Sequence, residues 1–179
     1  MSLRQFLYLA LAGILLGATA GTLYEWSRKS GATGSSIVSD QLPDFTLPAL
    51  DGNPWRAEEW RGRILVINFW ASWCPPCRKE MPLFVRLHEE LASKGVLFVG
   101  IAIDDPQSVQ NFVDTHGVEF PILLGQEQGI ELSRQLGNRV EALPFTVVAD
   151  RKGRIVLKQA GEMREEKLEP LLQQLLADY

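Results

Sequence analysis

Two cysteines separated by two prolines lie between a segment typical of a buried strand and a segment typical of a helix. Cys74 and Cys77 are the only cysteines among the 179 residues. Residues 64–70 (ILVINFW) are almost entirely apolar, as expected for a strand buried on both faces. After the pair, apolar residues recur at helical spacing, namely Met81, Phe84, Leu87 and Leu91. The sequence therefore predicts a Cys-x-x-Cys pair at the start of a helix.

The number of cysteines argues against two common structural roles. A disulfide scaffold needs more cysteines, spread along the chain. A structural zinc site usually takes four ligands, and the chain reaches four only by adding His88 and His116, which lack the close spacing of zinc ligands. We therefore predict no metal site. A lone structural disulfide, and copper(I) bound by the two thiolates, remain alternatives to a reactive pair.

A helix N-terminus suits a reactive thiol, because its free N–H groups and the positive end of its dipole stabilise the attacking thiolate. We expect Cys74 at the N-cap, the exposed end, and Pro75 at the first helical position. Cys77 lies one turn further, close enough to resolve a mixed disulfide. Because Pro75 and Pro76 lack an N–H, the pKa of the Cys74 thiol should be lowered only moderately. The pair should then be a better reductant than oxidant.

The composition divides the chain into three segments. Residues 1–26 include the uncharged stretch 6–23, which fits a membrane anchor or a signal peptide cleaved after Ala20. We favour the anchor because the apolar stretch continues past Ala20. Residues 27–40 are rich in Ser, Gly and Thr and are expected to form a flexible linker, and residues 41–179 to fold as one domain. A net charge of −4 without a basic cluster argues against nucleic acid as a partner.

Strand and helix patterns alternate along residues 41–179, which predicts an α/β domain. The turn Asp51-Gly52-Asn53 predicts a short N-terminal hairpin. The last two strands, joined by the turn at 150–153, should form an antiparallel hairpin, so the sheet is mixed. We expect strands at 64–70, 96–103, 120–124, 145–149 and 154–159, and helices at 77–94, 106–116, 130–136 and 165–177.

The segment Asn68–Cys77 (NFWASWCPPC) resembles the active-site segment of the thioredoxin superfamily. Pro82 stands where thioredoxins carry a helix-kinking proline, and Leu143-Pro144 precedes a strand as the family's cis-proline does. Residues 43–52 resemble the N-terminal extension of the TlpA/ResA branch. The resemblance implies a thioredoxin fold: a mixed central sheet flanked by helices, with an N-terminal hairpin extension. It also implies a mid-domain strand and helix insertion, which residues 106–124 could supply.

The resemblance assigns roles to residues near the pair. Cys74 would attack a substrate disulfide and Cys77 would release the product. The buried acid of thioredoxins is replaced by Asn68, whose amide cannot accept a proton. Glu80 lies three residues after Cys77, near it on one helix face, and similar proteins carry an acid there. Glu80 is therefore a candidate proton acceptor for Cys77, with a solvated glutamate in the first helical turn as the alternative.

Substrate contacts are expected around the pair. A cis bond at Pro144 would place its ring beside the disulfide and let the backbone of Leu143 pair with a substrate strand, whereas an ordinary trans proline would do neither. Trp73, beside Pro75 and Pro76, would be an exposed contact platform or a half-buried packing residue. Thioredoxins usually have Thr or Ser after the cis-proline, and Phe145 at this position would alter the substrate groove.

The resemblance implies a thiol–disulfide oxidoreductase outside the cytoplasm, most readily a protein-disulfide reductase. Its redox group is the Cys74–Cys77 disulfide itself, without another cofactor. Implied partners are apocytochrome c or another exported thiol protein as substrate, and a membrane thiol electron donor. The implied location is the bacterial inner membrane, with a single N-terminal span and the catalytic domain in the periplasm or outside. A cleaved signal would instead give a soluble periplasmic protein.

Two other functions are alternatives to this interpretation. A peroxiredoxin-type thiol peroxidase needs Pro-x-x-x-Thr-x-x-Cys, but Ile67 and Ala71 occupy the positions of the proline and the threonine. A non-enzymatic copper-delivery module would be supported by Cys-x-x-x-Cys and a distal histidine at matching spacing, and neither is present.

Overall fold

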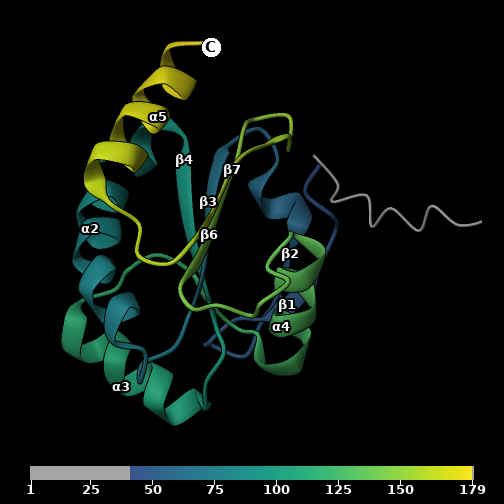
Figure 1. The fold of residues 1–179 in the computed structure, drawn as a ribbon, viewed down its shortest axis with the longest axis vertical. Helices are drawn as coiled ribbons and strands as arrows, with labels where there is room; N and C mark the ends of the chain where they lie inside the picture. The colour runs from purple at the N-terminus through teal and green to yellow at the C-terminus, as the bar shows by residue number, and fades with distance from the viewer. Residues whose placement is uncertain (1–40, 179) are drawn as a thin grey trace, which may run out of the picture. The chain divides into compact units, whose positions relative to one another are not determined.

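A five-stranded mixed sheet forms the centre of the domain in the computed structural model, which describes residues 41–178 (Figure 1). The strand order is β5 (Ile122–Leu124), β4 (Val96–Ala102), β3 (Ile64–Trp70), β6 (Phe145–Ala149), β7 (Ile155–Ala160). β3 pairs in parallel with β4, and β4 with β5, whereas the β3–β6 and β6–β7 pairs are antiparallel. The predicted mixed sheet and thioredoxin fold are confirmed.

Helices cover both faces of this sheet. Helices α2 (Pro75–Leu91), α3 (Pro106–His116) and α5 (Glu165–Ala177) lie on one face, and α4 (Gln126–Gln135) lies on the other with the N-terminal hairpin (Figure 1). The apolar run of β3 explains both layers, because side chains alternate between the faces of a strand. Val66 and Trp70 belong to the core cluster that contains the buried residues of α2, while Leu65 and Ile67 belong to the cluster beneath the hairpin.

The N-terminal extension forms the predicted hairpin. Strands β1 (Thr46–Pro48) and β2 (Pro54–Arg56) pair antiparallel, with Leu47 opposite Trp55. The hairpin also protects the edge of the main sheet, because the N–H of Leu50 donates to the carbonyl of Ile122 at 2.8 Å. Helix α3 and strand β5 supply the predicted mid-domain insertion. β5 is the edge strand that the hairpin protects, and it pairs with β4.

The helices and strands are those predicted, but two of the helices start at other residues than their apolar spacing indicates. Helix α2 begins at Pro75, the predicted first helical position, which lies before the apolar spacing that starts at residue 77, and it ends at Leu91, after which a 3-10 turn (Ala92–Lys94) follows. Helix α4 begins at Gln126 rather than at residue 130. Its first turn is polar, so apolar spacing did not reveal it. The structure fixes this turn by close packing instead, since a Cβ on Gly129 would lie 2.7 Å from the side chain of Ile103.

The predicted membrane segment 1–26 and linker 27–40 lie outside the described residues. Within residues 41–178, no helix has both the length and the apolar character needed to cross a membrane.

Candidate active site

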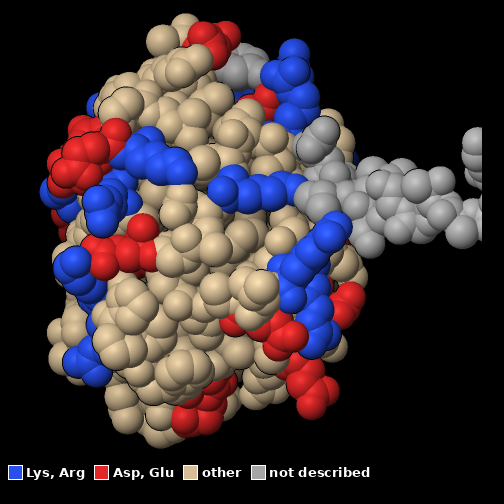
Figure 2. Space-filling view, viewed as in Figure 1, with Lys and Arg blue, Asp and Glu red and all other residues tan. Residues whose placement is uncertain are grey.

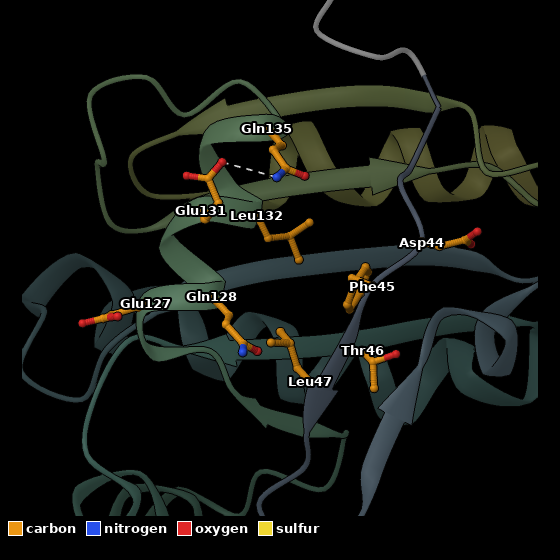
Figure 3. Close-up of a pocket in the computed structure, with 9 residues that line it drawn as sticks. All are labelled: Asp44, Phe45, Thr46, Leu47, Glu127, Gln128, Glu131, Leu132 and Gln135. Carbon is orange, nitrogen blue, oxygen red and sulfur yellow. Dashed lines mark hydrogen bonds between the residues drawn. The ribbon is translucent and has the colours of Figure 1, made fainter.

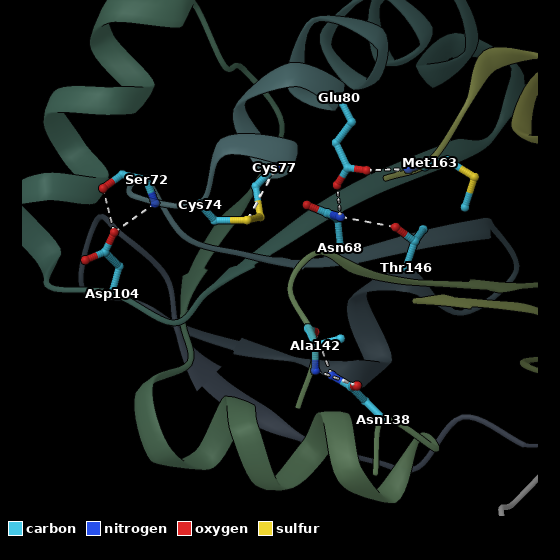
Figure 4. Close-up of a disulfide and its surroundings, with 10 residues drawn as sticks. All are labelled: Asn68, Ser72, Cys74, Cys77, Glu80, Asp104, Asn138, Ala142, Thr146 and Met163. Carbon is cyan, nitrogen blue, oxygen red and sulfur yellow. Dashed lines mark hydrogen bonds between the residues drawn. A yellow bond between two sulfur atoms is a disulfide. The ribbon is translucent and has the colours of Figure 1, made fainter. Parts of the chain in front are cut away.

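The two cysteines form a disulfide at the start of α2 (Figure 4). Cys74 is the N-cap of the helix, as predicted, and its Sγ accepts the N–H of Cys77 at 3.3 Å. Pro75 and Pro76 occupy the first helical positions. They have no N–H, so among the first three helical residues only Cys77 offers one to the sulfur. The sulfur therefore has a single first-turn N–H donor, the arrangement from which the sequence predicts a pKa of the Cys74 thiol that is only moderately lowered.

The expectation that Cys74 is exposed is wrong for the disulfide form. Its residue surface is 3% exposed and that of Cys77 is fully buried. Both cysteines belong to the apolar cluster that includes Trp70 and Phe84. The N-cap position alone suggested exposure, but both cysteines pack within this apolar cluster.

Glu80 is buried, which excludes the solvated alternative. Its residue surface is only 2% exposed, and it lies on the same helix as Cys77, one turn further. Each carboxylate oxygen accepts a hydrogen bond: Oε1 from Nδ2 of Asn68 at 2.7 Å and Oε2 from the N–H of Met163 at 2.6 Å (Figure 4). Burial raises the pKa of Glu80 from 4.5 to about 7, against the opposing effect of these two hydrogen bonds. Glu80 can therefore exchange a proton near neutral pH.

Asn68 and Thr146 fix the position of this carboxylate from the sheet. The two residues are opposite each other in the antiparallel β3–β6 pair, and both are buried. The Asn68 Nδ2 group donates to Thr146 Oγ1 at 3.1 Å as well as to Glu80. Neither Thr146 nor Met163 is predicted from the sequence as part of the site. A threonine within the apolar run FTVVA was the one available signal for Thr146, and no signal pointed to the backbone of Met163.

A second carboxylate holds the loop before Cys74. Asp104 Oδ2 accepts both the N–H of Ser72 at 2.8 Å and its hydroxyl at 2.6 Å (Figure 4). Asp104 follows β4, whose parallel register with β3 brings the ends of both strands to the same edge of the sheet. Neither Asp104 nor Ser72 is predicted from the sequence as part of the site, because their contact joins positions 32 apart in the chain.

The residues expected to contact substrate lie in different environments. Trp73 is 64% exposed, consistent with a contact platform rather than a packing residue. Pro75 is exposed and Pro76 is half-buried. The Leu143–Pro144 peptide bond is cis, with Leu143 half-buried and Pro144 buried.

Phe145, which is expected to alter the substrate groove, belongs to the core cluster beneath the N-terminal hairpin. It is buried, and its ring packs against that of Phe69, with 5.9 Å between the ring centroids. The two residues are paired across β3 and β6, which directs both side chains to the same face of the sheet.

Other parts of the described domain offer no comparable chemistry. A groove of about 400 Å³ lies between the N-terminal strand β1 and α4, on the face of the sheet opposite α2 (Figures 1 and 3). Its lining combines apolar Phe45, Leu47 and Leu132 with carboxylates and amides, and it contains no cysteine. Within residues 41–178, no three side chains of His, Cys, Asp or Glu are grouped as metal ligands would be.

Comparisons with known proteins agree with the geometry of this site. The Redoxin family matches residues 37–175. Thiol-disulfide oxidoreductase ResA of Bacillus cereus is 30% identical over 165 residues, which cover 90% of this chain and 91% of that protein. Thioredoxin-like protein YneN of Bacillus subtilis is 35% identical over 170 residues, covering 90% and 95%. A crystal structure of a thiol:disulfide interchange protein from Chlorobium tepidum superposes with a TM-score of 0.70 at 28% identity, covering 76% of this chain and 95% of the other.

Proposed function

We infer, from the premise that this chain belongs to the Redoxin family and is a thiol–disulfide oxidoreductase, that it reduces disulfides of exported proteins. One observation carries the direction of the reaction. Cys74 caps a helix whose first two residues are prolines, so its sulfur accepts a hydrogen bond only from the N–H of Cys77 in this first turn. A thiolate that is weakly stabilised makes the reduced form less favourable, and the dithiol is then a stronger reductant.

The catalytic cycle starts from the dithiol. The Cys74 thiolate attacks one sulfur of a substrate disulfide, forming a mixed disulfide and releasing the first substrate thiolate, which takes up a proton. The Cys77 thiol loses its proton, and its thiolate attacks the sulfur of Cys74. The second substrate thiolate leaves, and the Cys74–Cys77 disulfide remains. Two electrons have passed to the substrate, and a dithiol donor must return two electrons and two protons to the enzyme.

Glu80 is proposed as the acceptor of the Cys77 proton. The two side chains lie on the buried side of α2, three residues apart, and a pKa of about 7 lets the carboxylate accept and release a proton near neutral pH. The hydrogen bonds from Asn68 and Met163 hold the carboxylate in one orientation. Asn68 cannot accept the proton itself, so Glu80 performs at this site the role of the buried acid of thioredoxins.

The surface around the pair suits a protein substrate. Trp73 and Pro75 are exposed directly beside Cys74. Leu143 precedes the cis Pro144 and is half-exposed. We propose that an extended substrate segment pairs with the backbone at Leu143 while its apolar side chains contact Trp73.

We propose that the enzyme is tethered to the bacterial inner membrane by residues 1–26, with its catalytic domain in the periplasm or outside. The support is the uncharged stretch 6–23, followed by a polar linker. This location would bring the domain close to a membrane thiol electron donor. Exported proteins with exposed cysteine pairs, such as apocytochrome c, would be the substrates.

A reduction assay with a defined substrate tests this function. The reduced full chain is mixed with an apocytochrome c whose two haem-binding cysteines form a disulfide, and the free substrate thiols are counted over time. We expect stoichiometric reduction by the native protein. The Cys77→Ser variant should stop at a mixed disulfide, and Cys74→Ser should be inactive. If the native protein instead oxidises the reduced substrate, the proposed direction is wrong.

A further inference from the structure

Asp104 lies beside the active-site loop because of the sheet register. β3 and β4 are parallel, with Trp70 opposite Ala102, and the N–H of Ile103 donates to the carbonyl of Trp70 at 2.8 Å. The two chains therefore remain side by side beyond the last paired residues. Asp104 and Ser72 each follow this point by two residues, so their side chains meet at the carboxyl end of the sheet.

The Asp104 carboxylate uses both oxygens. Oδ2 accepts two hydrogen bonds from Ser72, one from the backbone N–H and one from the hydroxyl, and Oδ1 accepts the N–H of Asp105 at 2.8 Å. Asp105 in turn caps α3 by accepting the N–H of Ser108 at 3.0 Å. Hydrogen bonds to an ionised acceptor are stronger than those between neutral groups. The start of α3 therefore gives the carboxylate a fixed position from which it holds Ser72.

Ser72 is well placed to transmit this constraint. It lies in the short loop between β3 and α2, directly before the exposed Trp73 and two residues before Cys74. Ser72 and Cys74 are two residues apart, so their Cα atoms are at most about 7 Å apart, and the carboxylate that binds Ser72 acts on the segment that carries the reactive sulfur. The loop has one further internal bond, from the N–H of Cys74 to the carbonyl of Ala71 at 3.2 Å.

We propose that Asp104 is a positioning residue of the active site: it fixes the loop that carries Trp73 and Cys74, and its charge disfavours the Cys74 thiolate. Asp104 and the prolines would then act in the same direction, keeping the dithiol a strong reductant. The inference rests on the redox activity of Cys74 and is independent of the proposed substrate and location.

Other charged groups around the two cysteines come from α2, from the segment before α5 and from the start of α3. Arg78 lies in the first turn of α2, with its guanidinium 6.0 Å from the centroid of the Phe112 ring. Lys79 is paired with Glu162 at 2.8 Å, before α5. Glu80 is on the buried side of α2, and Asp105 is exposed at the start of α3. Asp104 differs from Asp105 in being half-buried and bonded directly to the loop.

The test measures the acidity of the Cys74 thiol in the reduced full chain, from the pH dependence of its alkylation rate. Asp104→Asn removes the charge but keeps an oxygen that can accept from Ser72. Asp105→Asn is the matched control, because it removes a neighbouring charge while asparagine still caps a helix well. Ser72→Ala removes the hydroxyl and leaves the carboxylate charge in place.

We expect Asp104→Asn to increase the acidity constant of Cys74 on the order of fivefold, the size of an interaction between charges in a partly screened environment. Asp105→Asn should change it less than about twofold, since exposed charges are screened. Ser72→Ala should also change it less than about twofold, because the Asp104 charge remains in place. An unchanged acidity constant in Asp104→Asn, or an equal change in Asp105→Asn, would overturn the assignment. A purely structural role of Asp104 would lower stability without this shift.

A measurement on the native protein keeps the inference testable if Asp104→Asn does not fold. The backbone N–H of Ser72 is in a loop beside an exposed tryptophan, yet it is bonded to a carboxylate. Its hydrogen exchange in the native protein should be at least about tenfold slower than that of an unbonded loop amide. Exchange at the rate of an unstructured loop would contradict a holding role for Asp104.

Discussion

Replacing Glu80 with glutamine should remove a pH dependence from the stability of the oxidised protein. Burial raises the pKa of Glu80 from 4.5 to about 7 in the folded state. The folded protein therefore binds the Glu80 proton more tightly than the unfolded chain does. Between these two pKa values the folded state holds more protons, so the free energy of unfolding falls as the pH rises.

The size of the effect follows from the two pKa values. The difference between about 7 and 4.5 corresponds to about 3 kcal/mol, at about 1.36 kcal/mol per pH unit. The stabilisation is complete below pH 4.5 and is lost as the pH passes through 7. Between pH 5 and pH 8, the free energy of unfolding should fall by roughly 2 to 3 kcal/mol through Glu80 alone.

Other groups titrate in the same range, so the comparison with Glu80→Gln is essential. Burial lowers the pKa of His88, which makes the folded protein more stable as the pH rises through the ordinary value of 6.5. This contribution opposes that of Glu80 but is the same in both proteins. The difference between the native protein and Glu80→Gln therefore isolates the carboxyl group.

The assay is urea unfolding of the oxidised full chain at several pH values between 5 and 8. Glu80→Gln should be less stable than the native protein at pH 5, because its amide places an NH₂ group against the donors Asn68 or Met163. The gap between the two proteins should close as the pH rises to 8. Parallel stability curves over this range would show that Glu80 does not titrate near neutral pH, and the proposed proton acceptor would have to be abandoned.

Three further predictions concern the thiol pair, the substrate surface and the core. Pro76→Ala restores an N–H in the first turn of α2 and should make the Cys74–Cys77 pair more oxidising by roughly 10–30 mV. This range follows because a hydrogen bond contributes about 0.5–1.5 kcal/mol and 30 mV equals about 1.4 kcal/mol. An unchanged reduction potential in glutathione redox buffers would contradict this reasoning. Trp73→Ala should slow the reduction of a protein disulfide by at least about fivefold, roughly 1 kcal/mol, because Trp73 is exposed beside Cys74. The rate with a small-molecule disulfide should be unchanged. Equal losses with both substrates would argue against a docking role. Phe84→Ala should destabilise the protein by about 3–5 kcal/mol in urea unfolding, because Phe84 is fully buried between α2 and the sheet. A decrease of less than about 1 kcal/mol in the free energy of unfolding would contradict this, since it would mean that the core readily closes the cavity.

The sequence determines the fold most clearly where a local pattern and tertiary packing agree. β3 (Ile64–Trp70) and β6 (Phe145–Ala149) have the predicted bounds because their apolar runs end at polar or turn residues. Helix α3 (Pro106–His116) also matches, since a proline begins it and Gly117 adopts the left-handed conformation that ends it. The position of Cys74 at the N-cap follows from the same local rules.

The supporting residues of the site could not be read from local patterns. The contact between Glu80 and the backbone of Met163 joins positions 83 apart in the chain, and that between Asn68 and Thr146 joins positions 78 apart. Such contacts depend on strand register and on loop geometry after β7, which no spacing rule gives. The burial of Cys74 likewise depends on packing in a cluster with residues from several elements, which the local N-cap rule does not include.

The most direct test of the reductase function is the equilibrium reduction potential of the Cys74–Cys77 pair in the full chain. Reference dithiol proteins range from roughly −270 mV for thioredoxin to roughly −120 mV for a strong oxidant. The two prolines, the single first-turn N–H at the Cys74 sulfur and the proposed effect of the Asp104 charge predict a value close to the reducing end. A value near −120 mV, the oxidising end of that rough scale, would contradict the proposed direction and indicate a disulfide donor to exported proteins.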